Sequence, residues 1–277
     1  MAYECRKAKR LGTKACMAIM GPSGSGKTVG ALILGKALCP PGKKVVLIET
    51  QPGQSDLYGA TFDFFIVDLA APFTPERCSA AIRAALKENA GVVIFDSLSH
   101  EWMGKGGILQ MVEDTPGTNS FAKWKQPSRS HGEFIEEFTG LAKTVHFIAT
   151  IRAKDKYVID KVVDKFGNEK SAPKKIGEAP IQREGIEYEF PITLMLDQET
   201  HRFKVWGDKT NGIFFSDEER VITPELGKRF AEWCKGSKGY EPLLQIGKLE
   251  DEEGAGGADE DESAEPQVHK AAPLKRR

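Results

Sequence analysis

The segment Gly21–Thr28, with the sequence GPSGSGKT, constrains the fold of this chain more than any other part of it. An apolar run over residues 15–20 precedes the segment, and a helix-like segment over residues 27–38 follows it. A buried strand, a glycine-rich turn and a helix in this order are typical of a loop that holds the phosphates of a nucleoside triphosphate. Glycines let successive backbone N–H groups face phosphate oxygens, and the following helix adds the positive end of its dipole.

The eight loop residues are therefore the candidate phosphate-binding residues: Gly21, Pro22, Ser23, Gly24, Ser25, Gly26, Lys27 and Thr28. We expect the Lys27 ammonium to reach the β and γ phosphates, and the Thr28 hydroxyl to ligate Mg²⁺. The sequence thus predicts ATP and Mg²⁺ as ligands. The alternative is a glycine-rich turn that binds nothing.

The composition indicates one globular domain with a tail. With 277 residues and 40% apolar content, the chain can bury one substantial core, and we expect a single domain over residues 1–247. From residue 248 the sequence turns to Gly, Ala, Asp and Glu without apolar periodicity, which predicts a disordered acidic tail over 248–277 with a basic end.

The net charge of −1 hides a segregation of charge along the chain. Residues 250–265 carry nine acidic and no basic side chains, and residues 266–277 carry four basic ones, which leaves residues 1–249 with a net charge of +4. A mildly basic body is compatible with a nucleic-acid partner but does not demand one.

Cysteine usage and hydropathy narrow the location of the protein. The five cysteines are scattered and never fall in C-x-x-C spacing, so they predict neither a disulfide framework nor a zinc site. The basic N-terminus lacks an apolar h-region, and no stretch of about 18 apolar residues follows it. These features favour a soluble cytoplasmic protein without a membrane partner.

Apolar strands and helices alternate through the first 150 residues. After the loop we expect strands at 44–49, 64–67, 91–96 and 145–150, helices at 75–89 and 134–143, and a loop-rich stretch at 98–131. Strands near 188–196 and 201–206 and a helix near 224–234 follow. Fully apolar strands in this alternation predict an α/β fold with a mainly parallel sheet flanked by helices.

Two acidic residues end strands near the loop. Asp96 is the last residue of an apolar strand. In phosphate-loop NTPases an aspartate at the end of a neighbouring strand helps to hold the Mg²⁺ ion of the nucleotide. Glu49 ends the strand after the loop helix, where a carboxylate would orient and partly deprotonate the attacking water. The alternatives are a structural strand-end aspartate and a solvated strand-end glutamate.

These residues carry a family resemblance. GPSGSGKT, the strand ending in Glu49, the VVIFDS strand and the later HFIATIR strand together resemble the RecA-like ATPase core. DSLSHEW at 96–102, TIRAK at 150–154 and PIQREGIEYEF at 180–190 are similar, more narrowly, to phage-encoded RecA-like proteins that include the Sak-type single-strand-annealing recombinases. The resemblance covers roughly residues 12–235.

The resemblance implies a RecA-like phosphate-loop NTPase core that couples ATP hydrolysis to binding of single-stranded DNA in a homo-oligomeric ring or filament. It also implies a role in phage recombination or replication in the bacterial host cytoplasm, with a single-strand-binding protein as a possible partner. Related proteins insert a basic residue from a neighbouring subunit into the ATP site. Here GDKTNG at 207–212 keeps Lys209 but lacks the accompanying arginine, and Arg152, Arg183 and Lys204 are the candidates to replace it.

Two basic segments are candidates for binding the polymer. The first interleaves Lys123, Lys125 and Arg129 with Trp124, because cations follow phosphates while bases stack on rings. Its alternative is a helix that packs Phe121 and Trp124 on the sheet. The second, over 152–183, reads as a hairpin that carries Lys174 and Lys175; its alternative is an ordinary solvated hairpin.

His100 and Trp102 follow Asp96 closely enough to sense the γ phosphate or to carry its state toward the polymer site. The alternative is that they are simply polar and aromatic residues packed near a strand end. The leading functional interpretation is a DNA-stimulated ATPase. A small-molecule phosphotransferase of the nucleotide-kinase type is an alternative, because such kinases use the same loop. An ATP-gated assembly protein without DNA binding is a further alternative.

Overall fold

The structure is a computed structural model that describes residues 5, 12–141, 143–163, 169–210, 212–214 and 219–236. For residues 157–163 and 169–176 the structure describes the backbone alone. The chain divides into two units, Met1–Leu244 and Gln245–Arg277, and all described residues belong to the first unit. The predicted acidic tail and the predicted domain end at residue 247 lie outside the described residues.

A mainly parallel sheet forms the centre of the described unit. Its strands are β1 (Cys16–Gly21), β2 (Lys44–Glu49), β3 (Phe65–Asp68), β4 (Ala90–Asp96), β5 (His146–Val163), β7 (Ile192–Leu196) and β8 (Phe203–Asp208), in the order β3-β2-β4-β5-β1-β7-β8. All neighbouring strands in this order are parallel except β7 and β8. Parallel strands bring their carboxyl ends to one edge of the sheet, where ligands bind in open α/β sheets.

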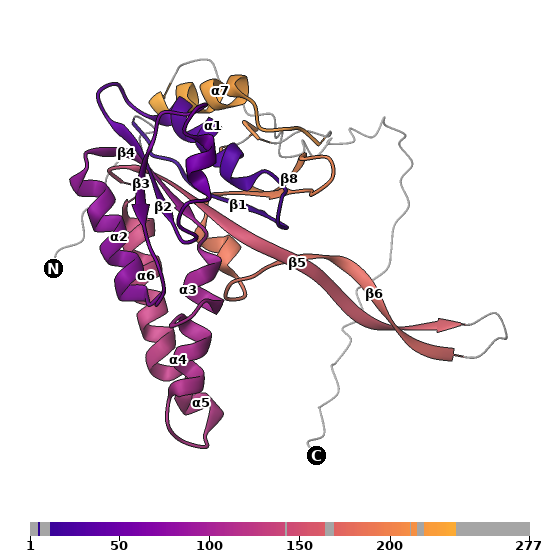
Figure 1. The fold of residues 1–277 in the computed structure, drawn as a ribbon. Coiled ribbons are helices and arrows are strands. Elements are labelled where there is room, and N and C mark those ends of the chain that lie inside the picture. Colours follow the sequence, from indigo (N-terminus) through magenta and orange to yellow (C-terminus); the bar gives the residue numbers. More distant parts are fainter. Residues whose placement is uncertain are drawn as a thin grey trace, which may run out of the picture. The chain divides into compact units, whose positions relative to one another are not determined.

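Helices cover both faces of the sheet (Figure 1). α1 (Lys27–Leu38) and α7 (Pro224–Lys235) pack in one apolar core, and α2 (Pro75–Lys87) and α6 (Lys125–Leu141) pack in the other. Alternate residues of β1 enter the two cores, as a strand buried on both faces requires. The predicted fold class is confirmed. Within the described part of the chain, no helix is both long and apolar enough to cross a membrane.

Two glycines allow the loop helix α1 to lie very close to the C-terminal elements. A Cβ added to Gly30 of α1 would lie 2.7 Å from Cδ1 of Ile222, and one added to Gly227 of α7 would lie 2.8 Å from Cβ of Ala37. Real Cβ atoms do not approach so closely. At Gly227 the neighbour is the rigid Cβ of Ala37, so a larger residue would push α7 away from α1, whereas at Gly30 the terminal methyl of Ile222 would have to rotate aside.

β5 extends beyond the sheet and pairs there with β6 (Glu169–Pro180) as an antiparallel hairpin (Figure 1). The pairing runs from Ala153 opposite Pro180 to Val163 opposite Glu169. The hairpin predicted over 152–183 is confirmed. Lys174 and Lys175 lie in β6, opposite Val158 and Tyr157.

The prediction of a loop-rich stretch over 98–131 is wrong. The structure has α3 (Ser99–Met103), α4 (Ile108–Asp114) and α5 (Ser120–Lys123) there, and α6 begins at Lys125 instead of residue 134. The buried face of the first half of α6 contains Pro127, Ser130 and His131 before Phe134. Because two of these buried residues are polar, the apolar periodicity that marks a helix is missing from the sequence.

Two short 3₁₀ helices, η1 (Ser55–Tyr58) and η2 (Ile186–Glu189), complete the fold. The strand predicted near 188–196 begins only at Ile192, because η2 and Pro191 precede it. Proline lacks the N–H that a central strand donates to its neighbour, so the strand starts after it.

Candidate functional site

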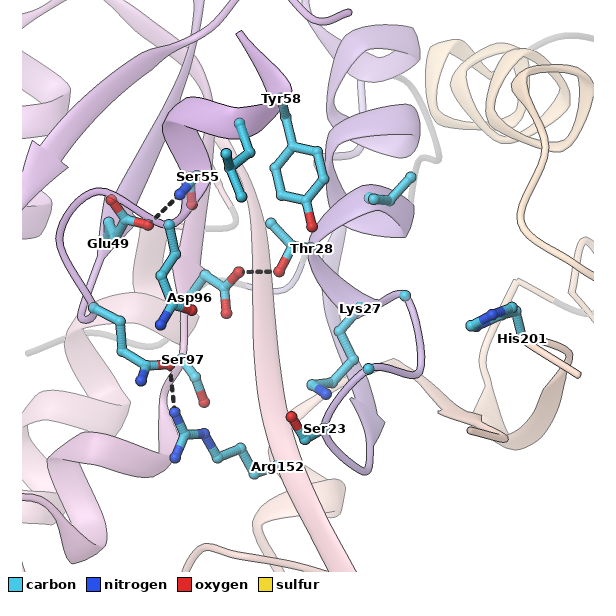
Figure 2. Close-up of a pocket in the computed structure, with 16 residues that line it drawn as sticks. Ser23, Lys27, Thr28, Glu49, Ser55, Tyr58, Asp96, Ser97, Arg152 and His201 are labelled. Atoms are coloured by element: carbon cyan, nitrogen blue, oxygen red, sulfur yellow. Dashed lines mark hydrogen bonds between the residues drawn. The ribbon is translucent and has the colours of Figure 1, made fainter. Parts of the chain in front are cut away.

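A cavity of about 480 Å³ lies at the carboxyl ends of the parallel strands (Figure 2). This volume is in the range of small-molecule sites. The lining comes from the phosphate loop and the start of α1, from the end of β2 and the segment after it, from the end of β4, from Arg152 within β5, and from the turn between β7 and β8. The lining residues are Ser23, Gly24, Gly26, Lys27, Thr28, Val29, Glu49, Gln51, Gln54, Ser55, Leu57, Tyr58, Asp96, Ser97, Arg152 and His201.

The loop turns at glycines and directs a helix start at the cavity. Gly24 and Gly26 have φ values of +78° and +90°, which side chains of L-residues rarely tolerate. α1 begins directly after Gly26, which has no side chain to cap the first backbone N–H groups of the helix. These N–H groups and the helix dipole make the loop suited to hold an anion.

Lys27 is a buried cation at the floor of the cavity. The residue is 9% exposed, and Nζ donates to the carbonyl oxygen of Pro22 and lies 3.5 Å from Oγ of Ser25. Burial lowers the pKa of Lys27, Asp96 opposes this effect, and Arg152 lowers the pKa further. A bound anion at the loop would stabilise the charged ammonium.

Asp96 is fixed between two threonine hydroxyls. Oγ1 of Thr28 donates to Oδ2 of Asp96, and Oγ1 of Thr150 donates to Oδ1, both over 2.5 Å (Figure 2 shows the first contact). Thr150 was missed by sequence reasoning. The contact follows from the register of the fold, because β4 and β5 pair Phe95 with Ala149 and so place the next residue of β5 beside Asp96.

Glu49 lines the cavity, but its carboxylate is engaged by the following loop. The residue is 2% exposed; Oε2 accepts the N–H of Gly53 over 2.9 Å, and Oε1 accepts the N–H of Ser55 over 2.6 Å. Figure 2 shows the side chain directed toward Ser55. Glu49 therefore holds the loop that leads into η1 in this structure.

Arg152 reaches the cavity from the same chain. It lies on β5 where this strand leaves the sheet; its Nη2 donates to Oε1 of Gln51 over 2.5 Å, and its backbone N–H donates to Oγ of Ser99. The backbone of Arg152 pairs with Gly21, the first residue of the phosphate loop. Arg152 thus places a positive charge in the cavity without a neighbouring subunit.

His100 lies behind the cavity wall. Its Nδ1 is 2.7 Å from Oγ1 of Thr50, and its ring stacks on Phe73 with centroids 5.0 Å apart. Burial lowers the pKa of His100, Arg152 lowers it further, and Asp96 opposes both. Since Thr50 also donates its backbone N–H to the carbonyl oxygen of Asp96, His100 contacts the strand-end acid through one residue.

Arg183 and Lys209 do not line this cavity. Arg183 lines a separate cavity of about 280 Å³ together with His131 of α6. Lys209 is exposed and follows directly after β8. Of the basic residues considered as activators, the structure brings only Arg152 to the phosphate loop of its own chain.

The first basic segment forms an exposed aromatic patch. Phe121 is 89% exposed, and Trp124 is 37% exposed and lies 5.9 Å from Trp102 of α3 between ring centroids. The alternative, in which Phe121 and Trp124 pack on the sheet, is therefore wrong. Lys123 and Lys125 flank Trp124, whereas Nε of Arg129 is 2.9 Å from Oε1 of Glu133.

Comparison of the sequence with models of known protein families shows the family of this chain. A model of the AAA domain matches residues 13–230, which include the phosphate loop, Glu49, Asp96, Thr150 and Arg152. The chain belongs to the AAA domain family. Membership of this family supports a phosphate-loop ATPase type of domain that binds ATP, usually together with Mg²⁺.

Among the solved structures that resemble this AAA domain is a KaiC-like protein from the hyperthermophilic archaeon Pyrococcus horikoshii OT3. It has 16% sequence identity and a TM-score of 0.38, and the match covers 77% of this chain and 83% of that chain. No curated protein matches the chain.

Proposed function

We propose that this AAA domain hydrolyses ATP with Mg²⁺ in the phosphate-loop cavity. The observation that carries the proposal is the contact between Thr28 and Asp96 beside the buried Lys27, because a hydroxyl, a carboxylate and a lysine in this arrangement fit a metal-bound triphosphate. The cavity volume and the open N–H groups at the start of α1 also fit this ligand.

Each residue has a distinct role in the proposal. The N–H groups of the loop bind phosphate oxygens, and Lys27 contributes its charge at the β and γ phosphates. Thr28 and Asp96 hold Mg²⁺, which neutralises the charge that develops on the phosphates. Arg152 acts in cis as a second cation near the γ phosphate, since it shares the cavity with Lys27 and Asp96.

Glu49 is the proposed base for the attacking water, and its contacts define what this role requires. Its two carboxylate oxygens accept the N–H groups of Gly53 and Ser55. Each oxygen keeps a second lone pair, so the carboxylate can accept a proton from water while both loop contacts persist. In this proposal the two N–H groups hold the Glu49 carboxylate in place for that proton transfer.

Phosphate release by the full chain, measured with and without Mg²⁺, tests the proposal. Asp96→Asn should bind ATP in the absence of Mg²⁺ like the wild type and lose Mg²⁺-dependent turnover by at least tenfold, because an amide is a poor Mg²⁺ ligand. Asp68→Asn, at the end of β3, is a matched control that lies outside the cavity lining. Phosphate transfer to nucleoside monophosphates without release to water would instead favour a phosphotransferase.

We propose single-stranded DNA as the polymer partner, bound at the patch formed by Phe121, Lys123, Trp124, Lys125 and Arg129. Exposed rings beside lysines suit stacked bases and phosphates. The β5–β6 hairpin with Lys174 and Lys175 is the second proposed contact. The patch is linked to the nucleotide cavity through α3. Trp124 of the patch contacts Trp102 of α3, and α3 begins three residues after Asp96.

Binding of a fluorescent oligo(dT) at several salt concentrations tests this partner. Trp124→Ala should weaken binding by roughly 5- to 150-fold, the equivalent of one stacked base, and leave the salt slope unchanged. Lys123→Ala with Lys125→Ala should flatten the salt slope by about two phosphate contacts. Unchanged binding in both variants would remove the patch from the DNA site and favour an ATP-gated assembly protein.

The finer assignment to phage recombination or replication rests on the resemblance of the DSLSHEW and PIQREGIEYEF segments. A homo-oligomeric ring or filament, and a single-strand-binding protein as partner, belong to the same proposal. Lys209 remains the candidate that inserts into the ATP site of a neighbouring subunit, because it is exposed and does not line the phosphate-loop cavity of its own chain. Sedimentation of the chain with and without ATP tests the assembly.

A further inference from the structure

A second cavity, of about 270 Å³, adjoins the phosphate-loop cavity; we call it the side crevice. The two share the lining residues Gly26, Val29 and His201, so they are continuous. The other residues that line the side crevice are mostly apolar: Ser25, Gly30, Ile33, Leu196, Val221 and Ile222. The side crevice is thus an apolar extension of a charged site.

The charges of the site set the direction in which a bound nucleotide lies. Asp96 and Arg152 lie on one side of the phosphate loop, and Figure 2 shows His201 on the opposite side. The terminal phosphate belongs near the metal-binding acid and the second cation. The base, at the other end of the molecule, therefore lies toward His201 and the side crevice.

His201 is placed to meet a flat aromatic ligand. It lies in the turn between β7 and β8, has a φ of +55°, and its side chain is exposed. A Cβ added to Gly26 would lie 3.7 Å from Nδ1 of His201, so the ring lies against the backbone of the phosphate loop. Val221, 44% exposed, presents an apolar side chain to the same crevice.

We propose that the side crevice binds the nucleobase, with His201 as the stacking residue and the side chains of Val29 and Val221 as apolar contacts. This inference rests on the proposed function, ATP binding at the phosphate loop, and adds the residues that recognise the base. A purine offers more stacking surface than a pyrimidine, so the crevice favours purine nucleoside triphosphates.

Calorimetric titration of the full chain with ATP, UTP and inorganic tripolyphosphate, each with Mg²⁺, tests the base site. Tripolyphosphate has the phosphates but no base. His201→Gly keeps the backbone conformation available and removes the ring. It should weaken ATP binding roughly tenfold, reduce the preference for ATP over UTP, and leave tripolyphosphate binding unchanged.

Two further variants complete the test. Val221→Trp fills the crevice from an exposed position and should also weaken ATP but not tripolyphosphate. Glu199 is exposed and lies in the same β7–β8 turn as His201, but it does not line the side crevice. Glu199→Ala should therefore change neither the affinity for ATP nor the affinity for tripolyphosphate.

The results separate the base site from the proposed function. If wild type binds ATP and both His201→Gly and Val221→Trp bind it equally well, the base lies elsewhere and only this inference fails. Equal weakening of ATP and tripolyphosphate would also overturn it, since the ring would then act on the phosphate loop. A wild type that binds neither ligand would overturn the proposed function together with the base site.

Discussion

Asp96 depends on two hydroxyl groups, one from the phosphate-loop helix and one from β5. Thr28 belongs to the loop motif and was expected at the metal, whereas Thr150 comes from a strand 54 residues further along the chain than Asp96. Thr150 is fully buried, so its hydroxyl can serve only groups inside the protein. It is a positioning residue in the proposed site, because it fixes the carboxylate without reaching the ligand.

Thr150→Val should show this positioning role. Valine keeps the shape but removes the donor from Oδ1 of Asp96, which we expect to cost about 1–3 kcal/mol of unfolding free energy and to raise the Mg²⁺ concentration needed for half-maximal turnover. Thr193→Val is the control, since Thr193 is an equally buried strand threonine that does not contact Asp96. An unchanged Mg²⁺ requirement would leave Thr150 with a purely structural role.

Lys27→Ala should separate ligand binding from stability. Because burial lowers the pKa of Lys27, its charge destabilises the folded protein in the absence of an anion. We expect the variant to unfold at the same or a higher temperature than the wild type without nucleotide, and to lose both ATP turnover and the rise in unfolding temperature on adding ATP with Mg²⁺. A variant that keeps this rise would contradict the assignment of the phosphate site.

The loop motif and the strand-end acids could be predicted from the sequence because their chemistry is local to each segment. The contacts of Glu49 could not. The carboxylate meets N–H groups only four and six residues away, but the path of that short loop is not encoded in any periodic pattern. His201 was missed as well, since its place beside Gly26 arises from the sheet order and not from a motif.

Among the elements, the loop after β2 depends most directly on a single side chain. Glu49→Gln replaces one acceptor oxygen by an NH₂ group, which cannot accept the N–H of Gly53 or Ser55. We expect a loss of about 1–3 kcal/mol in unfolding free energy and a loss of hydrolysis.

Comparison of ATP affinity and turnover distinguishes the two roles of Glu49. Retained ATP affinity with lost turnover supports the base role, and equal loss of both makes Glu49 structural. Asp56→Asn is a matched control, because it makes the same carboxylate-to-amide change at an exposed residue that lies outside the cavity lining.

The start of β5 contains a pH-sensitive contact. Nδ1 of His146 accepts the backbone N–H of Ala15 over 3.0 Å, and burial, with a smaller effect of Lys14, lowers the pKa of His146 from 6.5 to about 4. The unfolded chain therefore binds more protons than the folded one between these values. The stabilising contribution is complete above pH 6.5 and is lost as the pH falls toward 4.

His146→Asn should remove this dependence. Asn keeps an acceptor oxygen near the position of Nδ1 but does not titrate. We expect the unfolding free energy of the wild type to fall by about 3 kcal/mol more than that of the variant between pH 7 and pH 4, as measured by urea unfolding. Parallel pH profiles would show that His146 is not the titrating group.

Element prediction worked where burial followed a simple period. The strands β1 and β2 consist mostly of apolar residues, and the helices α1 and α2 bury apolar residues. The sequence therefore showed which of these segments are strands and which are helices. α6 was only half predicted, because its buried face includes the polar residue His131, which contacts Glu101 of α3 over 2.9 Å and packs edge-on against Trp102. Such pairs are visible only once the fold brings the partners together.

For the whole molecule, residues 1–249 have a net charge of +4 and residues 250–265 carry nine acidic side chains. This charge separation leads to a prediction about the affinity of the chain for DNA. If the acidic segment competes with nucleic acid, a chain ending at Gly247 should bind oligo(dT) more tightly at low salt, with ATP affinity unaltered. The difference should disappear at several tenths molar salt, where screening acts within about 3–8 Å. Equal DNA affinity at low salt would refute competition.

The close approach of Gly30 and Gly227 to their neighbours fixes how far the nucleotide-binding unit extends along the chain. The last residue that lines the main cavity is His201, yet α1 is supported by Ile222 and by α7, which ends at Lys235. A fragment that stops after β8 would retain every residue that lines the phosphate-loop cavity, but it would lose Val221 of the side crevice and leave one side of the loop helix exposed to water. Expression boundaries for this domain therefore belong after residue 236.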